Sequence, residues 1–244
     1  MRYLVISDVH ANLEALDAVL AAAGAWDHVL ALGDFVGYGA DPNAVIDRLG
    51  SLAPATWIRG NHDKVGCGLE AADSFNQLAR RAIEWTSRQL TDDHREWLAT
   101  LPEGPVVVNN LVEICHGAPY DEDAYVFDDL DATRAIQASG RPVCLFGHTH
   151  VPAAFALSRA ARVLHPLLGT RLDLSTAVDT AFLINCGAVG QPRDGDPRAA
   201  FGILDTADSS LTLARVAYDV AMAQSKIVAA GLPEVLAHRL GVGR

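Results

Sequence analysis

The sequence predicts an α/β fold, and three observations support this prediction. Apolar segments alternate with helix-like segments over the first sixty residues, in the order strand–helix–strand–helix–strand. This order favours parallel β-α-β units with right-handed connections. Short apolar segments separated by turn residues follow Pro152 and indicate further strands. Half of the 244 residues are hydrophobic and 20% are charged, which is typical of a globular chain with a substantial core.

The first elements can be assigned in order from apolar spacing and turn residues. Apolar residues recur at helical spacing after Leu13, with Asn12 as the expected N-cap and Gly24 as the stop. A second helix begins with Pro42 in its first turn and ends before Gly50. Buried strands are expected before, between and after these helices, at residues 2–7, 28–32 and 55–59.

The rest of the chain continues this pattern. Residues 71–101 form a helical insertion, a hairpin turns at Asn109 and Asn110, and a terminal helical segment breaks near Gly231. We expect one domain over residues 1–244, because neither a repeat nor a low-complexity linker divides the chain. The other expected elements are strands at 106–108, 111–115 and 143–146, a helix at 128–139, an antiparallel sheet from 153–157, 162–164, 181–185, 201–205 and 211–216, and helices within 220–240.

Composition excludes several classes of function. The chain has 19 Lys and Arg against 30 Asp and Glu, a formal charge of −11, which argues against long nucleic acid as a partner. The N-terminal apolar run breaks at Asp8 and is too short for a secretory signal. No apolar stretch is long enough to span a membrane, so no membrane partner is expected. The four cysteines are widely spaced, which favours a reduced, cytoplasmic protein.

Polar side chains follow five of the predicted strands, at the point where each strand ends. Because the carboxyl ends of parallel strands meet at one edge of a sheet, we expect these side chains to converge. Glycines beside them permit tight turns and close backbone approach. The residues are Asp8, His10, Asp34, Asn61, His62, Asp63, His116, His148 and His150.

Imidazole nitrogens combined with carboxylate and amide oxygens suit Mn²⁺, Fe²⁺, Co²⁺, Ni²⁺ or Zn²⁺. Five histidines and two aspartates exceed the needs of one tetrahedral ion but fit two ions that share a carboxylate. Two divalent ions with Asp8 and Asp34 as the only anionic ligands leave about two positive charges, which suits a phosphate ester.

Single motifs within this set are weak evidence. Asp8-x-His10 alone is more typical of a capping aspartate and a surface histidine, and Gly33-Asp34 alone is more typical of a turn. All five segments in order, each at a strand end, predict a metal site instead. Outside the set, the other four histidines are expected to be structural, the tryptophans to pack, and the acidic run at 121–131 to form a solvated loop and helix start.

These motifs resemble the calcineurin-like metallophosphoesterase superfamily, whose pattern is D-x-H, G-D, G-N-H-D, H and G-H-x-H. Here it is matched by Asp8-Val9-His10, Gly33-Asp34, Gly60-Asn61-His62-Asp63, His116 and Gly147-His148-Thr149-His150. The segment at residues 185–193, N-C-G-A-V-G-Q-P-R, is similar to one in small bacterial phosphodiesterase-like members.

The resemblance implies a four-layer α/β/β/α sandwich of two mixed sheets flanked by helices. It implies that one ion is bound by Asp8, His10 and His150, that a second is bound by Asn61, His116 and His148, and that Asp34 bridges them. His62 would protonate or stabilise the leaving oxygen. In this family a metal-bridging hydroxide attacks phosphorus in line, since the ions depress the pKa of bound water.

One departure from the wider superfamily excludes a protein-phosphatase activity. Protein Ser/Thr phosphatases have G-D-x-V-D-R-G after the second strand. This chain has Gly37 in place of their histidine-orienting Asp and Tyr38 in place of their phosphate-binding Arg. Asp63 stands where those enzymes have Glu. The residue that orients His62 is left open by the sequence.

The sequence therefore predicts a dinuclear metal-dependent hydrolase of a small phosphoester, a phosphodiester rather than a monoester. Arg193 or Arg198, in the loop at 187–198, is expected to reach the substrate, with Arg193 as the candidate, and the insertion at 71–101 to cap the cleft. The alternatives are a phosphomonoesterase, a nuclease, which would need a groove rich in Lys and Arg, and a non-catalytic scaffold, whose relatives lose ligands that this chain retains. Natural substrate, metal pair and oligomeric state stay open.

Overall fold

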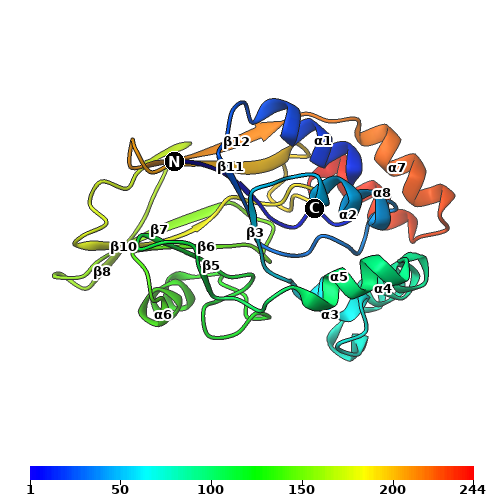
Figure 1. The fold of residues 1–244 in the computed structure, drawn as a ribbon, viewed down its shortest axis with the longest axis horizontal. Coiled ribbons are helices and arrows are strands. Elements are labelled where there is room, and N and C mark those ends of the chain that lie inside the picture. Colours follow the sequence, from blue (N-terminus) through cyan, green and yellow to red (C-terminus); the bar gives the residue numbers. More distant parts are fainter.

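A computed structural model describes residues 1–244 as four layers: two six-stranded sheets packed face to face, with helices outside both (Figure 1). The predicted α/β class and α/β/β/α layering are thereby confirmed. The helices are α1 (Leu13–Ala22), α2 (Pro42–Gly50), α3 (Asn61–Gly66), the 3₁₀ turn η1 (Ala72–Ser74), α4 (Gln77–Gln89), α5 (Asp92–Thr100), α6 (Asp129–Ala138), α7 (Val220–Ala229) and α8 (Glu234–Val242).

Both sheets are mixed. In the first sheet β1, β2 and β3 are parallel, and β11, β12 and β9 extend it in antiparallel fashion. The strands of the first sheet, in spatial order, are β3 (Ala55–Trp57), β2 (His28–Ala31), β1 (Arg2–Ile6), β11 (Ala199–Asp205), β12 (Ser210–Val216) and β9 (Arg171–Asp173). Those of the second are β4 (Val106–Val107), β5 (Val112–Ile114), β6 (Val143–Phe146), β10 (Thr180–Asn185), β7 (Ala153–Ser158) and β8 (Val163–Pro166).

Of the parallel strands, β1, β2 and β6 are buried on both faces over most of their length, which explains why they are continuous apolar runs rather than alternating ones. In β1, Leu4 and Ile6 pack with α1 in the core outside the first sheet. Val5 of the same strand points the opposite way, into the core between the two sheets, where it joins Ile114 and Leu145 of the second sheet. The two sheets therefore share one core, and this core fixes the position of one sheet relative to the other.

The strands after Pro152 do not form the single antiparallel sheet that the sequence predicted. They divide between the sheets: β9, β11 and β12 join the first, and β7, β8 and β10 join the second. In addition, β10 pairs in parallel with β6. The physical reason is that β1 and β6 would each otherwise be an exposed apolar edge of a sheet, and both edges need a partner strand.

The acidic run at 121–131 also differs in part from its prediction as a solvated segment. Glu122 is buried and pairs with Arg59, with Nη2–Oε1 at 3.0 Å, and with Lys64, with Nζ–Oε1 at 3.2 Å. Asp128 does cap a helix, because its side chain accepts from the backbone N–H groups of Leu130 and Asp131 at the start of α6. The first half of the run is therefore anchored to the fold by cations.

Helices cover the edge of the sheets where β1, β2 and β3 end. The segment at 71–101 contains η1, α4 and α5, and α4 shares an apolar cluster with the hairpin of α7 and α8. Tyr38 lies in the same cluster. None of the helices combines the length and the apolar character that crossing a membrane requires.

Candidate metal centre

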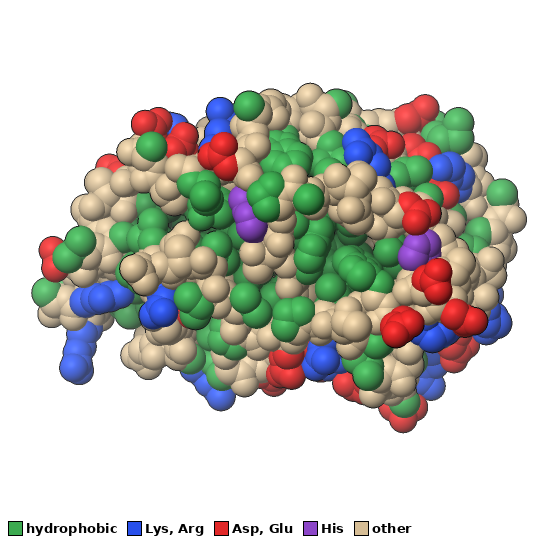
Figure 2. Space-filling model, in the orientation of Figure 1, with side chains coloured by type: hydrophobic (Ala, Val, Ile, Leu, Met, Phe, Trp, Pro, Cys, Tyr) green, Lys and Arg blue, Asp and Glu red, His purple; other side chains and the backbone are tan.

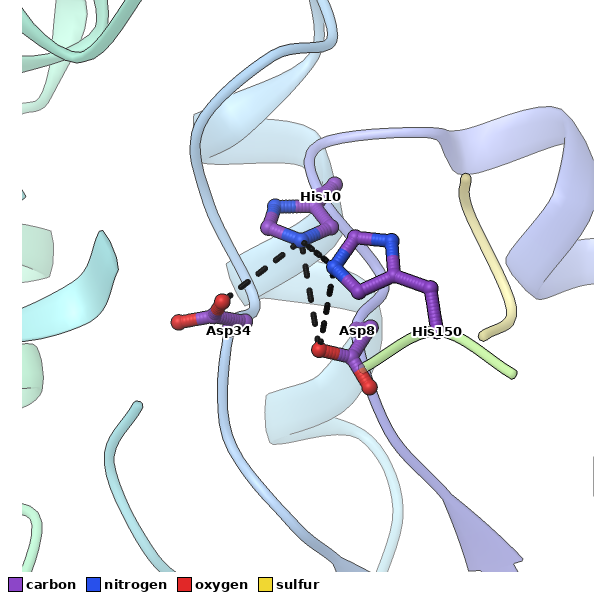
Figure 3. Close-up of side chains that lie close together, drawn as sticks. All are labelled: Asp8, His10, Asp34 and His150. Atoms are coloured by element: carbon purple, nitrogen blue, oxygen red, sulfur yellow. Dashed lines mark hydrogen bonds and ion pairs between the residues drawn. The ribbon is translucent and has the colours of Figure 1, made fainter. Parts of the chain in front are cut away.

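Five strand ends bring the predicted ligands together in the interior. Two groups of ligand atoms each lie within 4.8 Å of one another, and all their residues are buried. Asp34 belongs to both groups. The first group is Asp8, His10, Asp34 and His150, drawn in Figure 3, and the second is Asp34, His116 and His148.

In the first group the ring nitrogens and carboxylates face a common point (Figure 3). His10 Nε2 is 3.1 Å from His150 Nε2 and 3.5 Å from Asp34 Oδ2. His150 Nε2 is 3.4 Å from Asp8 Oδ1. The residues come from the ends of β1, β2 and β6, so both sheets contribute to this group.

The second group adjoins the first through Asp34. His116 Nε2 is 3.4 Å from Asp34 Oδ2 and 3.2 Å from His148 Nδ1. Asn61, at the start of α3, adds its Oδ1 at 3.3 Å from His116 Nε2. All seven predicted ligands therefore lie in one continuous cluster.

Backbone carbonyls fix the orientation of three of the imidazoles. The Nδ1 atoms of His10, His116 and His150 lie 3.0, 2.7 and 2.6 Å from the carbonyl oxygens of Val36, Leu32 and Gln191. Because a carbonyl only accepts, Nδ1 must donate its proton, and in the neutral form of each ring Nε2 keeps a lone pair directed into the cluster. His148 is reversed: its Nδ1 faces His116, and its Nε2 is buried without a partner.

The backbone of the cluster is strained in a way that the sequence does not reveal. Five of the predicted ligands have φ values between 49° and 66°, in the left-handed region that non-glycine residues avoid. Each such residue costs about 1–3 kcal/mol and persists only where surrounding contacts hold it. These ligands are Asp8, His10, Asp34, His148 and His150.

Electrostatics make most of the imidazoles neutral and therefore able to bind a cation. Burial lowers the pKa of His10 to about 4 and that of His148 to about 3, and it lowers the pKa of His150 well below its usual value. His116 differs: burial lowers its pKa, but the charge and hydrogen bond of Asp34, the charge of Asp8 and the hydrogen bond to Leu32 together outweigh burial and raise the pKa to about 10.

The two carboxylates of the cluster differ as well. Burial raises the pKa of Asp8 to about 6. Burial acts in the same direction on Asp34, but the adjacent rings of His116 and His62 outweigh it and lower the pKa of Asp34 well below its usual value. Neutral imidazoles, carboxylates and one amide in a buried space form a donor set that fits borderline divalent cations.

His62 lies against this cluster and is oriented by aromatic rings rather than by a carboxylate. Its backbone N–H donates to Asp34 Oδ1 at 2.8 Å. The centroid of its ring is 4.5 Å from that of Tyr38 and 4.6 Å from that of Phe75. Its Nδ1 is buried without a hydrogen-bond partner and faces Gly37, where any Cβ would overlap it. Burial lowers the pKa of His62 well below its usual value.

Asp63 points away from His62 and joins two loops of the cluster. Its Oδ1 accepts from the N–H groups of Phe35 and Val36 at 2.8 and 3.2 Å, and its Oδ2 accepts from Gly60 at 3.0 Å. Asp63 is the third residue of α3, where an acidic side chain commonly reaches back to the N-cap. Its role is therefore to hold the loop of Asp34 against the start of α3.

The two arginines of the loop at 187–198 are placed differently. Arg193 lies with its guanidinium carbon 5.6 Å from the centroid of the Tyr38 ring, and its Nη2 donates to Gln191 Oε1 at 2.9 Å. Arg198 pairs with Asp196, its neighbour in the same loop, and more than half of its side chain is exposed. Only Arg193 therefore borders the cluster.

The sequence prediction missed two aromatic residues at the site, Phe75 beside His62 and Tyr125 beside His148. The ring centroid of Tyr125 is 4.0 Å from that of His148, and the ring of Phe127 stacks on Tyr125 at 4.9 Å. Tyr125 and Phe127 lie in the acidic run, where the surrounding charges gave no reason to expect a ring beside the ligands. A pair of aromatic residues within an otherwise charged segment was the available signal.

Comparison with known proteins identifies relatives along the whole chain. The model of the calcineurin-like phosphoesterase superfamily domain matches residues 1–209. An uncharacterized protein of Methanocaldococcus jannaschii is 35% identical over 246 residues, covering 98% of this chain and 97% of the relative.

Solved structures show the same architecture. A metallophosphoesterase from Sphaerobacter thermophilus is 39% identical, with a TM-score of 0.87 and full coverage of both chains. A hypothetical protein from Pyrococcus horikoshii shares the fold at 18% identity, with a TM-score of 0.79 over 100% of this chain and 98% of that one.

Replacing Asp63 by Asn should destabilise the metal-free protein. An amide cannot accept from Phe35, Val36 and Gly60 together, and its NH₂ group would face a backbone donor. The expected loss is about 1–3 kcal/mol in the free energy of unfolding, measured by urea denaturation at pH 8. Asp73→Asn is the control, because that side chain is 93% exposed. Equal effects of the two substitutions would contradict the role given to Asp63.

Proposed function

The chain belongs to the calcineurin-like phosphoesterase superfamily, and from this premise we propose that it is a dinuclear metal-dependent hydrolase of small phosphodiesters. The observation that carries the proposal is the shared position of Asp34 between two groups of buried ligands. A bridging carboxylate is the arrangement expected where two cations act on one phosphoryl group.

The residues present fit two divalent ions of the Mn²⁺, Fe²⁺, Co²⁺, Ni²⁺ and Zn²⁺ class. One ion would be held by Asp8, His10 and His150, the other by Asn61, His116 and His148, with Asp34 between them. Such ions supply Lewis-acid polarisation of the phosphoryl oxygens and activate water near neutral pH.

The remaining residues act on the substrate. His62 lies beside Asp34 and would donate a ring N–H to the leaving oxygen. Because burial keeps this imidazole neutral, it stabilises the leaving oxygen by a hydrogen bond and needs no prior protonation. Arg193, which lies beside the Tyr38 ring, would place its charge on a phosphoryl oxygen.

The charges of the chain support a small substrate over a nucleic acid. Both lysines are engaged: Lys226 pairs with Glu14 and Asp41, and Lys64 pairs with Glu70, Glu122 and Asp123. In Figure 2 acidic and basic side chains lie mostly around the outline of the visible face, and no continuous basic stripe crosses it. A cytoplasmic location stays a prediction, to which the four free thiols are suited.

Metal stoichiometry tests the shared position of Asp34. We expect about two Mn²⁺ per chain in equilibrium dialysis, about one for His150→Ala, and a loss of both for Asp34→Ala. The exposed His165 provides the control substitution, His165→Ala, which should bind as the unmodified chain does. Hydrolysis of bis-p-nitrophenyl phosphate should follow the metal content. Retention of two ions by Asp34→Ala would refute the dinuclear hydrolase. An unmodified chain that binds no metal and stays inactive after Mn²⁺ is added would also refute it, and would favour a non-catalytic scaffold.

Removing the His62 imidazole should reduce turnover without removing metal. We expect His62→Ala to lower kcat about 100-fold or more, the usual contribution of a positioned acid–base group. His238→Ala, at an exposed position, is the control. Loss of metal as the only effect would show that His62 is a ligand instead.

The pH profile tests whether His62 acts as a neutral donor. Its pKa lies well below 6.5, so its protonation state does not change between pH 6 and pH 8. The ratio of kcat for the unmodified chain to kcat for His62→Ala should therefore be constant over this range. A protonated acid would make that ratio fall with each pH unit above its pKa, by about ten-fold.

Loss of the Arg193 charge should weaken substrate binding. A hydrogen bond to a charged group contributes about 1.5–3 kcal/mol, so Arg193→Ala should raise KM for bis-p-nitrophenyl phosphate by about 10-fold or more. Arg198→Ala is the matched control from the same loop, since its guanidinium pairs with Asp196. An unchanged KM for Arg193→Ala would exclude a contact with the substrate.

A further inference from the structure

A cavity of about 170 Å³ opens beside the second ligand group. It adjoins the predicted ligands and the predicted acid on one side, and its other walls combine three aromatic rings with polar side chains and one alanine. The residues that matter here are Asn61, His62 and His148 on the ligand side, and Tyr38, Phe75 and Tyr125 among the walls. Because His62 is part of the wall, a group in this cavity lies on the leaving-oxygen side of the ester.

Two of the ring-bearing walls come from the helical insertion and the acidic run. Phe75 lies between η1 and α4 in the helical insertion, and its ring packs on His62. Tyr125 comes from the acidic run before α6, and its ring lies on His148. Tyr125 is 45% exposed and Phe75 is partly exposed, so part of each side chain faces solvent. Phe127 stacks on the Tyr125 ring, which leaves the remaining exposed surface of Tyr125 for a ligand.

The charges around the cavity favour an uncharged occupant. The Lys64 side chain is 8% exposed, and its Nζ is 2.9 Å from Glu70 Oε2, 3.2 Å from Glu122 Oε1 and 2.6 Å from Asp123 Oδ2. The only cation in the lining is therefore neutralised by three carboxylates, and a second phosphate would find no free positive partner there. The same pairs anchor the segment of Tyr125 to α3.

The remaining lining offers hydrogen bonds rather than a fully apolar surface. Asn76 uses its Oδ1 to cap α4, accepting from Leu78 and Ala79, so its NH₂ group is left to donate. Asp123 contributes a carboxylate acceptor, and Ser74 a hydroxyl. The cavity volume is below the roughly 300–1,000 Å³ of pockets for drug-sized ligands, which favours a small group such as a single base.

We propose that this cavity is the leaving-group subsite of the hydrolase and that it binds a nucleobase, a planar ring whose edge both donates and accepts hydrogen bonds. The proposal rests on the proposed function and names the class of its substrate: a nucleoside phosphodiester. The ester phosphate lies at the ligand cluster, and the base lies between the insertion and the acidic run. Phe75 and Tyr125 are specificity residues, which recognise the ring and do not contact the reacting atoms.

Binding of adenosine to the full chain tests the subsite without requiring turnover. We expect saturation transfer in NMR from the protein to the base protons of adenosine. Phe75→Ala and Tyr125→Ala should each raise the Kd for adenosine by about five-fold or more, the usual effect of removing one ring that contacts a base. Leu130→Ala, at an 81% exposed position in the same acidic run, is the control and should leave Kd unchanged. Urea denaturation establishes that each variant is folded.

Binding of glucose and of phenol tests which feature of adenosine the cavity recognises. Glucose binding as tightly as adenosine would overturn recognition of a flat ring, and phenol binding as tightly would overturn recognition of its hydrogen-bonding edge. If neither aromatic substitution changes the Kd for adenosine, the base binds elsewhere and the proposed subsite is wrong.

Activity separates this proposal from the one on which it rests. A chain that hydrolyses bis-p-nitrophenyl phosphate but does not bind adenosine retains the hydrolase function and loses the subsite. A chain that binds adenosine through Phe75 and Tyr125 but hydrolyses no ester supports the ring site and contradicts the hydrolase.

Discussion

The contacts between the two sheets at the ends of β1, β2, β5 and β6 are the constraint on which the site depends. The backbone N–H of His148, from the second sheet, donates to both carboxylate oxygens of Asp8, from the first, at 3.2 Å. The ring of His116 donates across the same gap to the carbonyl of Leu32. A shift of one sheet relative to the other would break both bonds and separate the two halves of the ligand cluster, so the shared core fixes the geometry of the chemistry.

The cluster is costly to assemble, and this cost explains much of its surroundings. Five residues with positive φ and several buried, nearly unsolvated imidazoles and carboxylates oppose folding. Hydrogen bonds to the ligand loops offset part of this cost: Asp8 donates its N–H to Gly33, His10 donates to Asp34, and Asp63 binds three N–H groups of the neighbouring loops. Divalent cations, when bound, would add favourable charge at the point where lone pairs converge.

Local patterns predicted the α/β class and the convergence of the candidate ligands, and the resemblance to the superfamily predicted the two packed sheets. Apolar runs ending in Asp or His place polar groups at the carboxyl edge of a sheet wherever the strands are parallel. The pairing of the later strands could not be read in this way, since β10 and β11 are similar apolar runs and only tertiary contacts assign them to different sheets. The burial of Glu122 was missed for a related reason: the cations that hold it, Arg59 and Lys64, lie about sixty positions earlier in the chain.

The position of His62 shows how one departure in sequence changes the physics of a site. An aspartate beside an imidazole would orient it and raise its pKa by charge. Here Gly37 has φ near +88° and leaves no room for a side chain, so the ring lies between Tyr38 and Phe75 instead. Aromatic packing orients the ring while burial keeps it neutral. Phe75, which helps to orient His62 in the absence of an aspartate, also forms a wall of the adjoining cavity. Orientation of His62 and the shape of the space beside it are therefore coupled through one side chain, and a substitution there should affect both.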